Sequence, residues 1–367
     1  MMEFSCSNCG HAYPTDGMPY KCQTCGGHYD FITPLPFDPI QVDHSQPGIW
    51  RYRHTFGLPL EVESVSLGEG NTPLVWAEVF GRKIAFKCEF LNPSGSFKDR
   101  GSTLIATWLR SRGITEVVED SSGNAGASLA AYAARAGIKT SIFVPMSASD
   151  PKSRQIKAYG AQIIPISGSR TVVAEAVKAV ADRGAIYASH AYLPFNLPGY
   201  ATAAYEIFEQ SGNVMPGAII LPAGQGGMLL GMSLGFNALR IANKLGNHYP
   251  KIIGVQVRAC APLWEMYTGA GAGAGVGFPA EKSTLAEGVQ VRNPLRRETV
   301  LRAISESKGS ISVADEKEII PGFKALAQLG FYVEPTSAIV WSALIRTIRY
   351  LDDPVIVILT GSGHKYG

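Results

Sequence analysis

The chain has 367 residues, of which 46% are hydrophobic and 17% charged, and its formal net charge is +3. This composition is typical of a compact globular protein and excludes extended disorder for most of the chain. The charge is too small to indicate nucleic-acid binding, and no apolar run approaches the ~20 residues that span a bilayer. Because the N-terminus has neither a basic start nor an apolar core, we expect a cytoplasmic protein that binds no nucleic acid and no membrane.

Four cysteines near the N-terminus form two Cys-x-x-Cys pairs, Cys6 with Cys9 and Cys22 with Cys25, separated by 12 residues. In a reducing compartment, pairs at this spacing are metal ligands rather than disulfides, and the glycines that follow each pair allow tight turns around the sulfurs. The pattern predicts a zinc ribbon over residues 1–33. Four thiolates leave no open coordination position, so this Zn²⁺ is expected to be structural.

Beyond the ribbon, short strand-like runs alternate with longer alanine-rich helical segments. Strands are predicted, in chain order, at residues 84–90, 116–120, 140–145, 162–166, 185–189, 218–223, 251–257 and 354–359. Helices are predicted at residues 125–136, 171–183, 200–210, 228–244 and 337–350. Short strands separated by helices predict an α/β fold built from βα units on parallel sheets.

Lys98 is the most informative single residue. It lies in the run Asn-Pro-Ser-Gly-Ser-Phe-Lys-Asp-Arg-Gly at residues 92–101, between a turn and an apolar helical stretch. A lysine held at such a junction and partly shielded from water can lose its proton near neutral pH and form an imine with a carbonyl. A surface lysine paired with Asp99 fits the same segment, so other features must decide.

Three further turns follow predicted strands. Residues 121–126, Ser-Ser-Gly-Asn-Ala-Gly, open a helix whose N–H groups suit a carboxylate, although an ordinary helix cap fits as well. Residues 223–228, Ala-Gly-Gln-Gly-Gly-Met, suit a monophosphate, and the absence of a following Gly-Lys-Ser/Thr disfavours a nucleotide P-loop. Residues 359–364 place two hydroxyls, Thr360 and Ser362, where one could donate to a ring nitrogen or simply cap a turn.

Together these segments predict a pyridoxal phosphate site. They supply an imine-forming lysine, a phosphate nest, a carboxylate loop and a hydroxyl for the pyridine nitrogen. A dehydrogenase needs a dinucleotide fingerprint, and a phosphoryl transferase needs a Walker-type lysine or metal-binding carboxylates. Neither pattern is visible in the sequence.

The segments resemble the four signatures of fold-type-II pyridoxal phosphate enzymes. Residues 67–74, Leu-Gly-Glu-Gly-Asn-Thr-Pro-Leu, and the ribbon make the chain most similar to the threonine synthases within that group. The resemblance implies two three-layer αβα domains of the tryptophan synthase beta-like architecture. A large cofactor-binding domain would comprise residues 34–97 and 190–367, and a small domain residues 98–189. A homodimer is expected from the resemblance only.

The resemblance also implies a role for each site residue. Lys98 would be the Schiff-base lysine, Asn124 would bond the phenolic oxygen of the ring, and Thr360, with Ser362 as the alternative, would face the pyridine nitrogen. The full set of cofactor contacts would be Phe97, Lys98, Asn124, Gly224, Gln225, Gly226, Gly227, Met228 and Thr360. The substrate would bind Ser121, Ser122, Asn124 and Ala125.

The implied reaction converts O-phospho-L-homoserine and water to L-threonine and phosphate by γ-elimination and β-addition, with Lys98 moving protons. The sequence departs from the threonine synthase pattern at residues 195–202, where polar residues are fewer and Tyr200 is bulky, and at Ser362 and His364. Candidates for the substrate phosphate are Lys152, Ser153, Arg154 and His190.

Other interpretations of the sequence are proteins that have the same cofactor site. A threonine or serine dehydratase and a diaminopropionate lyase need no second phosphate pocket, and a cysteate synthase acts on phosphoserine and sulfite. A cofactor-binding regulatory or scaffold protein is the alternative from a different class. The lysine, the asparagine and the glycine loop argue against it.

Overall fold

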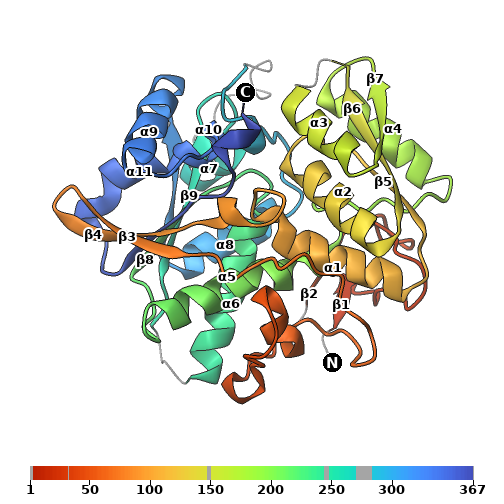
Figure 1. Cartoon of the computed structure of the whole chain (residues 1–367), viewed down its shortest axis with the longest axis horizontal. Helices are drawn as coiled ribbons and strands as arrows, with labels where there is room; N and C mark the ends of the chain where they lie inside the picture. The colour runs from red at the N-terminus through yellow and green to blue at the C-terminus, as the bar shows by residue number, and fades with distance from the viewer. Residues whose placement is uncertain (1–2, 32, 147–149, 244–247, 270–282, 367) are drawn as a thin grey trace. The chain divides into compact units, whose positions relative to one another are not determined.

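The computed structural model describes residues 3–31, 33–146, 150–243, 248–269 and 283–366, which fold into two compact units. The first unit is Met1–Gly70 with Asn92–Gly199, and the second is Asn71–Leu91 with Tyr200–Gly367. The chain therefore passes between the units after Gly70, Leu91 and Gly199. Each unit is a layered α/β structure (Figure 1).

The first unit contains a two-stranded antiparallel ribbon and a parallel three-stranded sheet ordered β5-β6-β7. Its elements are β1 (Phe4–Cys6), β2 (Tyr29–Phe31), η1 (Pro39–Gln41), η2 (Gly48–Thr55), α1 (Lys98–Ser111), β5 (Glu116–Glu119), α2 (Asn124–Ala136), β6 (Lys139–Pro145), α3 (Asp150–Ala158), β7 (Gln162–Ile166), α4 (Arg170–Ala181) and η4 (Pro194–Asn196).

Helices cover both faces of this sheet. Ile142 and Val144 of β6 are buried with Ala127 of α2 and Ile156 of α3, whereas Phe143, between them, packs with the side chains of α4. Because successive side chains of a strand point to opposite faces, α2 and α3 form one layer and α4 the other. The unit is thus a three-layer αβα structure, as predicted.

The second unit is built on a six-stranded sheet ordered β10-β9-β8-β11-β4-β3, parallel except for β3. Its strands are β3 (Leu74–Val79), β4 (Arg82–Lys87), β8 (Ala218–Pro222), β9 (Lys251–Val257), β10 (Ser310–Ala314) and β11 (Val355–Ile358). Its helices are η3 (Glu89–Leu91), α5 (Leu197–Gln210), α6 (Gly227–Ala242), α7 (Pro262–Thr268), η5 (Glu287–Val289), α8 (Arg297–Glu306), α9 (Glu316–Gln328), α10 (Pro335–Ala338), α11 (Val340–Thr347), η6 (Ile348–Tyr350) and η7 (Gly363–Lys365). The first three residues of α5 belong to the first unit.

This sheet is also buried on both faces. Val255 of β9 lies in one cluster with Ile319 of α9 and Leu344 of α11. A Cβ added to the adjacent Gly254 would instead contact Leu229 of α6 at 3.2 Å, so α6 covers the opposite face. Every residue of β8 is buried, which is the pattern of a parallel strand between two helical layers.

Most predicted elements are confirmed, with two corrections. Residues 185–189 form no strand, and only Tyr187 makes an isolated bridge to Val118 of β5. The chain turns away directly afterwards, since Leu193 N donates to Ser189 O at 3.0 Å. The helix predicted at residues 337–350 is divided into α10, α11 and η6, with α10 and α11 separated at Ile339, whose carbonyl accepts from Ser342 Oγ.

The two units differ from the predicted domain boundaries at residues 34–70, 92–97 and 190–199, all of which belong to the first unit. The reason is a buried carboxylate. Glu69 accepts hydrogen bonds from Trp50 Nε1 (2.7 Å) and from the Tyr132 hydroxyl of α2 (2.8 Å). The ribbon joins the same unit through Met18, which is buried beside Leu109 of α1.

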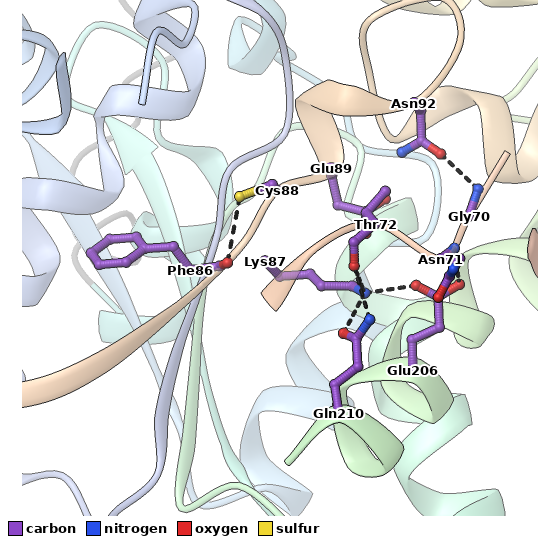
Figure 2. Close-up of polar contacts among 10 residues, drawn as sticks. All are labelled: Gly70, Asn71, Thr72, Phe86, Lys87, Cys88, Glu89, Asn92, Glu206 and Gln210. Carbon is purple, nitrogen blue, oxygen red and sulfur yellow. Dashed lines mark hydrogen bonds and ion pairs between the residues drawn. The ribbon is translucent and has the colours of Figure 1, made fainter. Parts of the chain in front are cut away.

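A buried ion pair organises the start of the second unit (Figure 2). Lys87, the last residue of β4, and Glu206 of α5 are both fully buried, and Lys87 Nζ lies 2.6 Å from Glu206 Oε2. Lys87 Nζ also donates to Thr72 O (2.7 Å) and Gln210 Oε1 (2.9 Å), and Glu206 Oε1 accepts from Asn71 N at 2.7 Å. The pair therefore fixes α5 and residues 71–72 to the end of β4.

We predict that Lys87→Met destabilises the protein by about 3–5 kcal/mol, because it leaves the Glu206 carboxylate buried without its cation. The double variant Lys87→Met/Glu206→Gln is expected to recover much of this loss, since the glutamine still accepts from Asn71 N. The matched control is Lys251→Met, which removes an exposed pair with Asp352 (3.1 Å) and costs under about 1 kcal/mol. Urea unfolding measures all three, and equal losses in the two single variants would contradict the prediction.

Candidate active site

Lys98 is the first residue of α1 and follows a tight turn. Gly95 has φ 87°, a value that favours glycine, and its N–H donates to Asn92 O at 2.7 Å. The Asn92 amide oxygen in turn accepts from Gly70 N at 2.9 Å (Figure 2). The Lys98 side chain is half-buried, and its Nζ lies 4.5 Å from the centroid of the Phe97 ring. Lys98 is therefore partly shielded from water, as predicted.

The carboxylate next to Lys98 holds this turn in place. Asp99 is fully buried and accepts from Ser94 N (2.6 Å), Ser94 Oγ (2.5 Å) and Ser128 Oγ of α2 (2.6 Å). Hydrogen bonds to an ionised group are stronger than those between neutral groups. Asp99 thus joins the turn before Lys98 to helix α2.

Two buried titratable groups are electrostatically coupled to Lys98. Burial raises the pKa of the Glu119 carboxyl, at the end of β5, well above its usual range, and Asp120 adds to the rise while Lys98 and Arg170 oppose it. Burial, together with the charge of Lys98, holds the pKa of His190 well below its usual range. Burial therefore favours the neutral form of both groups.

The predicted carboxylate loop lies between β5 and α2. Asn124 is the first residue of α2, and the N-cap residue of that helix is Gly123, which has no side chain to cap it. A Cβ at Gly126 would lie 1.8 Å from Ser121 O, so only glycine allows the loop to fold back on the helix this closely. Because α1 and α2 pack together, this loop and Lys98 belong to one group of residues.

The glycine loop of the second unit joins β8 to α6. Gly226 precedes α6 with φ 82°, and a Cβ there would lie 2.4 Å from Val300 Cγ2. A Cβ at Gly224 would lie 3.0 Å from Gly288 O, and one at Gly227 would lie 3.3 Å from Tyr200 Cε2. The N-cap residue of α6, Gly226, has no side chain to cap the helix. The loop presents backbone N–H groups at the start of a 16-residue helix, which is the arrangement that binds phosphate.

Thr360 lies at the same edge of the sheet as the glycine loop. It follows β11, and β11 pairs in parallel with β8, so the carboxyl ends of the two strands are adjacent. Thr360 is buried, its N–H donates to Ser337 Oγ (2.5 Å), and the two hydroxyl oxygens are 3.2 Å apart. Ser362 Oγ instead accepts from His364 N at 3.3 Å and caps η7.

The structure thus places the predicted residues in two groups, one in each unit. The first contains Phe97, Lys98 and the loop 121–125, and the second contains the loop 224–228 and Thr360. Gln225 has a structural bond as well, since its Oε1 accepts from Leu295 N at 3.1 Å. Ser337, beside Thr360, was not predicted because no local pattern marks a residue 23 positions away.

The four ribbon cysteines converge. Their Sγ atoms all lie within 4.8 Å of one another, with Cys6 and Cys25 3.4 Å apart and Cys9 and Cys22 3.7 Å apart. Among the described residues this cluster contains the four thiols and neither histidine of the ribbon. Matching turns hold the two pairs, because Gly10 N donates to Cys6 O and Gly26 N to Cys22 O.

Comparison with known proteins agrees with this geometry. A family model described as pyridoxal-phosphate dependent enzyme matches residues 65–361. The chain belongs to this family. It is 32% identical to the threonine synthase of Methanosarcina acetivorans over 98% of this chain and 91% of that protein. It is 31% identical to the threonine synthase of Methanocaldococcus jannaschii, over 98% of this chain and 92% of that protein.

Solved structures show the same fold. A threonine deaminase from T.th. has a TM-score of 0.65 and 25% identity, covering 79% of this chain and 92% of its own. Maize serine racemase has a TM-score of 0.67 and 24% identity, and the match covers 80% of this chain and 88% of the racemase. The fold is therefore that of fold-type-II pyridoxal phosphate enzymes, as predicted. No described helix is long and apolar enough to cross a membrane.

The residues present fit pyridoxal phosphate. Side chains at Gly224 and Gly226 would fill the space at the start of α6, where the N-cap residue is itself a glycine. In the other unit, a half-buried lysine begins α1 beside an aromatic ring. Each group is of a type that suits this cofactor, backbone N–H groups for its phosphate and an amine for its aldehyde.

We predict that Gly226→Ala lowers the affinity for pyridoxal phosphate about tenfold or more. An alanine at φ 82° is strained by roughly 1–2 kcal/mol and also collides with Val300, so the loop must move. The control is Gly137→Ala at the end of α2, where φ is 72° and a Cβ meets nothing within 4 Å. Titration followed by cofactor absorbance measures both, and unchanged affinity in Gly226→Ala would refute the phosphate assignment.

Proposed function

We propose that the protein is a pyridoxal phosphate-dependent lyase of the threonine synthase type, which converts O-phospho-L-homoserine and water to L-threonine and phosphate. The observation that carries this proposal is the extent of the similarity. The threonine synthases of Methanosarcina acetivorans and Methanocaldococcus jannaschii are 32% and 31% identical over 98% of the chain, whereas the threonine deaminase and the serine racemase are 25% and 24% identical over 79% and 80% of it.

In this proposal the Lys98 amine would hold the cofactor and would move protons on the substrate carbons. The bound cofactor supplies an electron sink for the carbanion at Cα. In the second unit, residues 224–228 would hold the cofactor phosphate through backbone N–H groups, and the Thr360 hydroxyl would hold the pyridine nitrogen. In the first unit, Asn124 would hold the phenolic oxygen of the ring, and the first turn of α2, with Ser121, Ser122 and Ala125, would bind the substrate carboxylate.

Lys152 is the candidate that best suits the substrate phosphate. Gln155 Nε2 of α3 donates to Ser94 O at 3.0 Å, so α3 contacts the turn that leads to Lys98. Lys152 precedes Gln155 by three residues and therefore lies on the same helix face, whereas Arg154 is exposed. His190, also considered from the sequence, is kept neutral by burial and suits a dianion poorly.

The zinc ribbon is part of the same proposal. Four Sγ atoms within 4.8 Å of one another suit the tetrahedral coordination of one Zn²⁺ by Cys6, Cys9, Cys22 and Cys25. Its role is structural, since residues of the ribbon pack into the same core as α1. The cytoplasmic location and the homodimer stay predictions from the sequence.

The decisive experiment offers the holoenzyme O-phospho-L-homoserine, L-serine and L-threonine separately. We expect equal amounts of phosphate and threonine from the first and no 2-oxo acid from the others. Lys152→Ala should raise KM for the phosphorylated substrate by roughly 10- to 100-fold, because a hydrogen bond to a charged group is lost. The control Lys157→Ala changes an exposed lysine of the same helix. Production of 2-oxo acids without phosphate release would establish a dehydratase instead.

A further inference from the structure

A buried tyrosine is bonded to the residue that precedes the carboxylate loop. Asp120 lies between the end of β5 and Ser121, and its Oδ1 accepts from the Tyr187 hydroxyl at 2.7 Å. Tyr187 is 2% exposed, and burial raises the pKa of its hydroxyl well above the usual range. The hydroxyl therefore keeps its proton and is the donor in this bond.

The backbone holds Tyr187 beside β5. This strand is at the edge of its sheet, and Val118 N donates to Ile186 O at 2.9 Å, while Ala188 N donates to Val118 O at 3.0 Å. Because these two bonds lie on either side of Tyr187, they fix its register relative to the strand. The side-chain bond to Asp120 extends the same attachment to the position where the loop begins.

The zinc ribbon covers the ring of Tyr187. Tyr20 lies two positions before the predicted zinc ligand Cys22, and its ring makes an edge-to-face contact with the ring of Tyr187, with centroids 5.3 Å apart. Tyr20 is itself buried, and its hydroxyl donates to Asp182 Oδ1 at 2.9 Å, directly after α4. Lys21 Nζ lies 2.7 Å from the same oxygen. The part of the ribbon that contacts Tyr187 is thus attached to the end of α4.

We propose that Tyr187 is a positioning residue for the carboxylate loop, residues 121–126, and that the ribbon keeps it in place through Tyr20. The carboxylate role of the loop rests on the proposed function. The inference goes further because it links the ribbon to the affinity for substrate, through direct contacts from Tyr20 to Tyr187 and from Tyr187 to Asp120. A metal site with no open coordination position thereby supports binding without taking part in the chemistry.

The consequence for binding follows from the population of the ordered loop. When a ligand binds only one loop conformation, its affinity is reduced by the fraction of molecules that hold this conformation. Losing the bond between Tyr187 and Asp120 lowers that fraction, and the same opening exposes the backbone N–H groups of the loop to exchange with solvent. Faster hydrogen exchange at the loop and weaker binding of the carboxylate should therefore occur together.

The first test measures hydrogen–deuterium exchange in the full-length holoenzyme by mass spectrometry. Tyr187→Phe removes only the hydroxyl and should speed exchange at residues 120–127 by roughly two- to tenfold, the range expected for one hydrogen bond. The control, Tyr132→Phe, removes a buried hydroxyl of the same unit that donates to Glu69 at 2.8 Å, and it should leave exchange at these residues unchanged. Equal exchange there in wild type and Tyr187→Phe would overturn the inference.

A second pair of variants tests the role of the ribbon. Tyr20→Leu removes the ring that contacts Tyr187 and should speed exchange at residues 120–127 by a similar factor, at unchanged zinc content. Tyr20→Phe keeps the ring, loses only the bond to Asp182 and should stay close to wild type. Unchanged exchange in Tyr20→Leu, or an equal increase in both variants, would show that the ring contact does not hold Tyr187 in place.

The last test asks whether the loop acts on the carboxylate. Binding of L-threonine, and of L-threonine amide, which lacks the carboxylate, is followed by the absorbance of the bound cofactor. Tyr187→Phe should weaken binding of L-threonine by roughly two- to tenfold and leave binding of the amide unchanged. Equal weakening of both would contradict a positioning role toward the carboxylate. Because no readout uses turnover of O-phospho-L-homoserine, absent turnover would refute the proposed function without deciding this inference.

Discussion

The arrangement around Lys98 depends on one buried carboxylate. Asp99 has no exposed surface, so its charge must be satisfied by donors within the protein. Those donors are Ser94 in the preceding turn and Ser128 in α2. The turn before Lys98 and helices α1 and α2 are thus joined through a single buried anion.

In the second unit, the buried ammonium group of Lys87 holds neighbouring elements together in a similar way. Lys87 fixes α5 to β4 through Glu206, and α5 supports α6, because a Cβ at Gly231 of α6 would lie 2.3 Å from Tyr200 Cβ. The Lys87–Glu206 ion pair therefore helps to fix α6 and the glycine loop that precedes it, and no sequence pattern predicts this pair. A parallel sheet buried on both faces adds Thr360 at the same edge.

The parts of the fold that the sequence predicted are those with local signals. These signals are the alternation of strands and helices, the paired cysteines and the glycine turns, and each depends on residues that are close together in the sequence. Features that depend on contacts between residues far apart in the sequence were not predicted. Residues 34–70 were assigned to the other domain because nothing local shows that Glu69 bonds Tyr132. Likewise, no local pattern predicts the hydrogen bond between Ser102 and His190, which are 88 positions apart in the chain.

The central claim is that Lys98 is the residue that carries pyridoxal phosphate. Borohydride reduction of the holoenzyme makes a lysine–cofactor link permanent, and proteolysis followed by mass spectrometry then locates it. The account predicts a phosphopyridoxyl mass on the peptide that contains Lys98, and none on the peptides that contain Lys87 or Lys152. Cofactor found on any other lysine, or bound cofactor that reduction fails to attach to the chain, would contradict it.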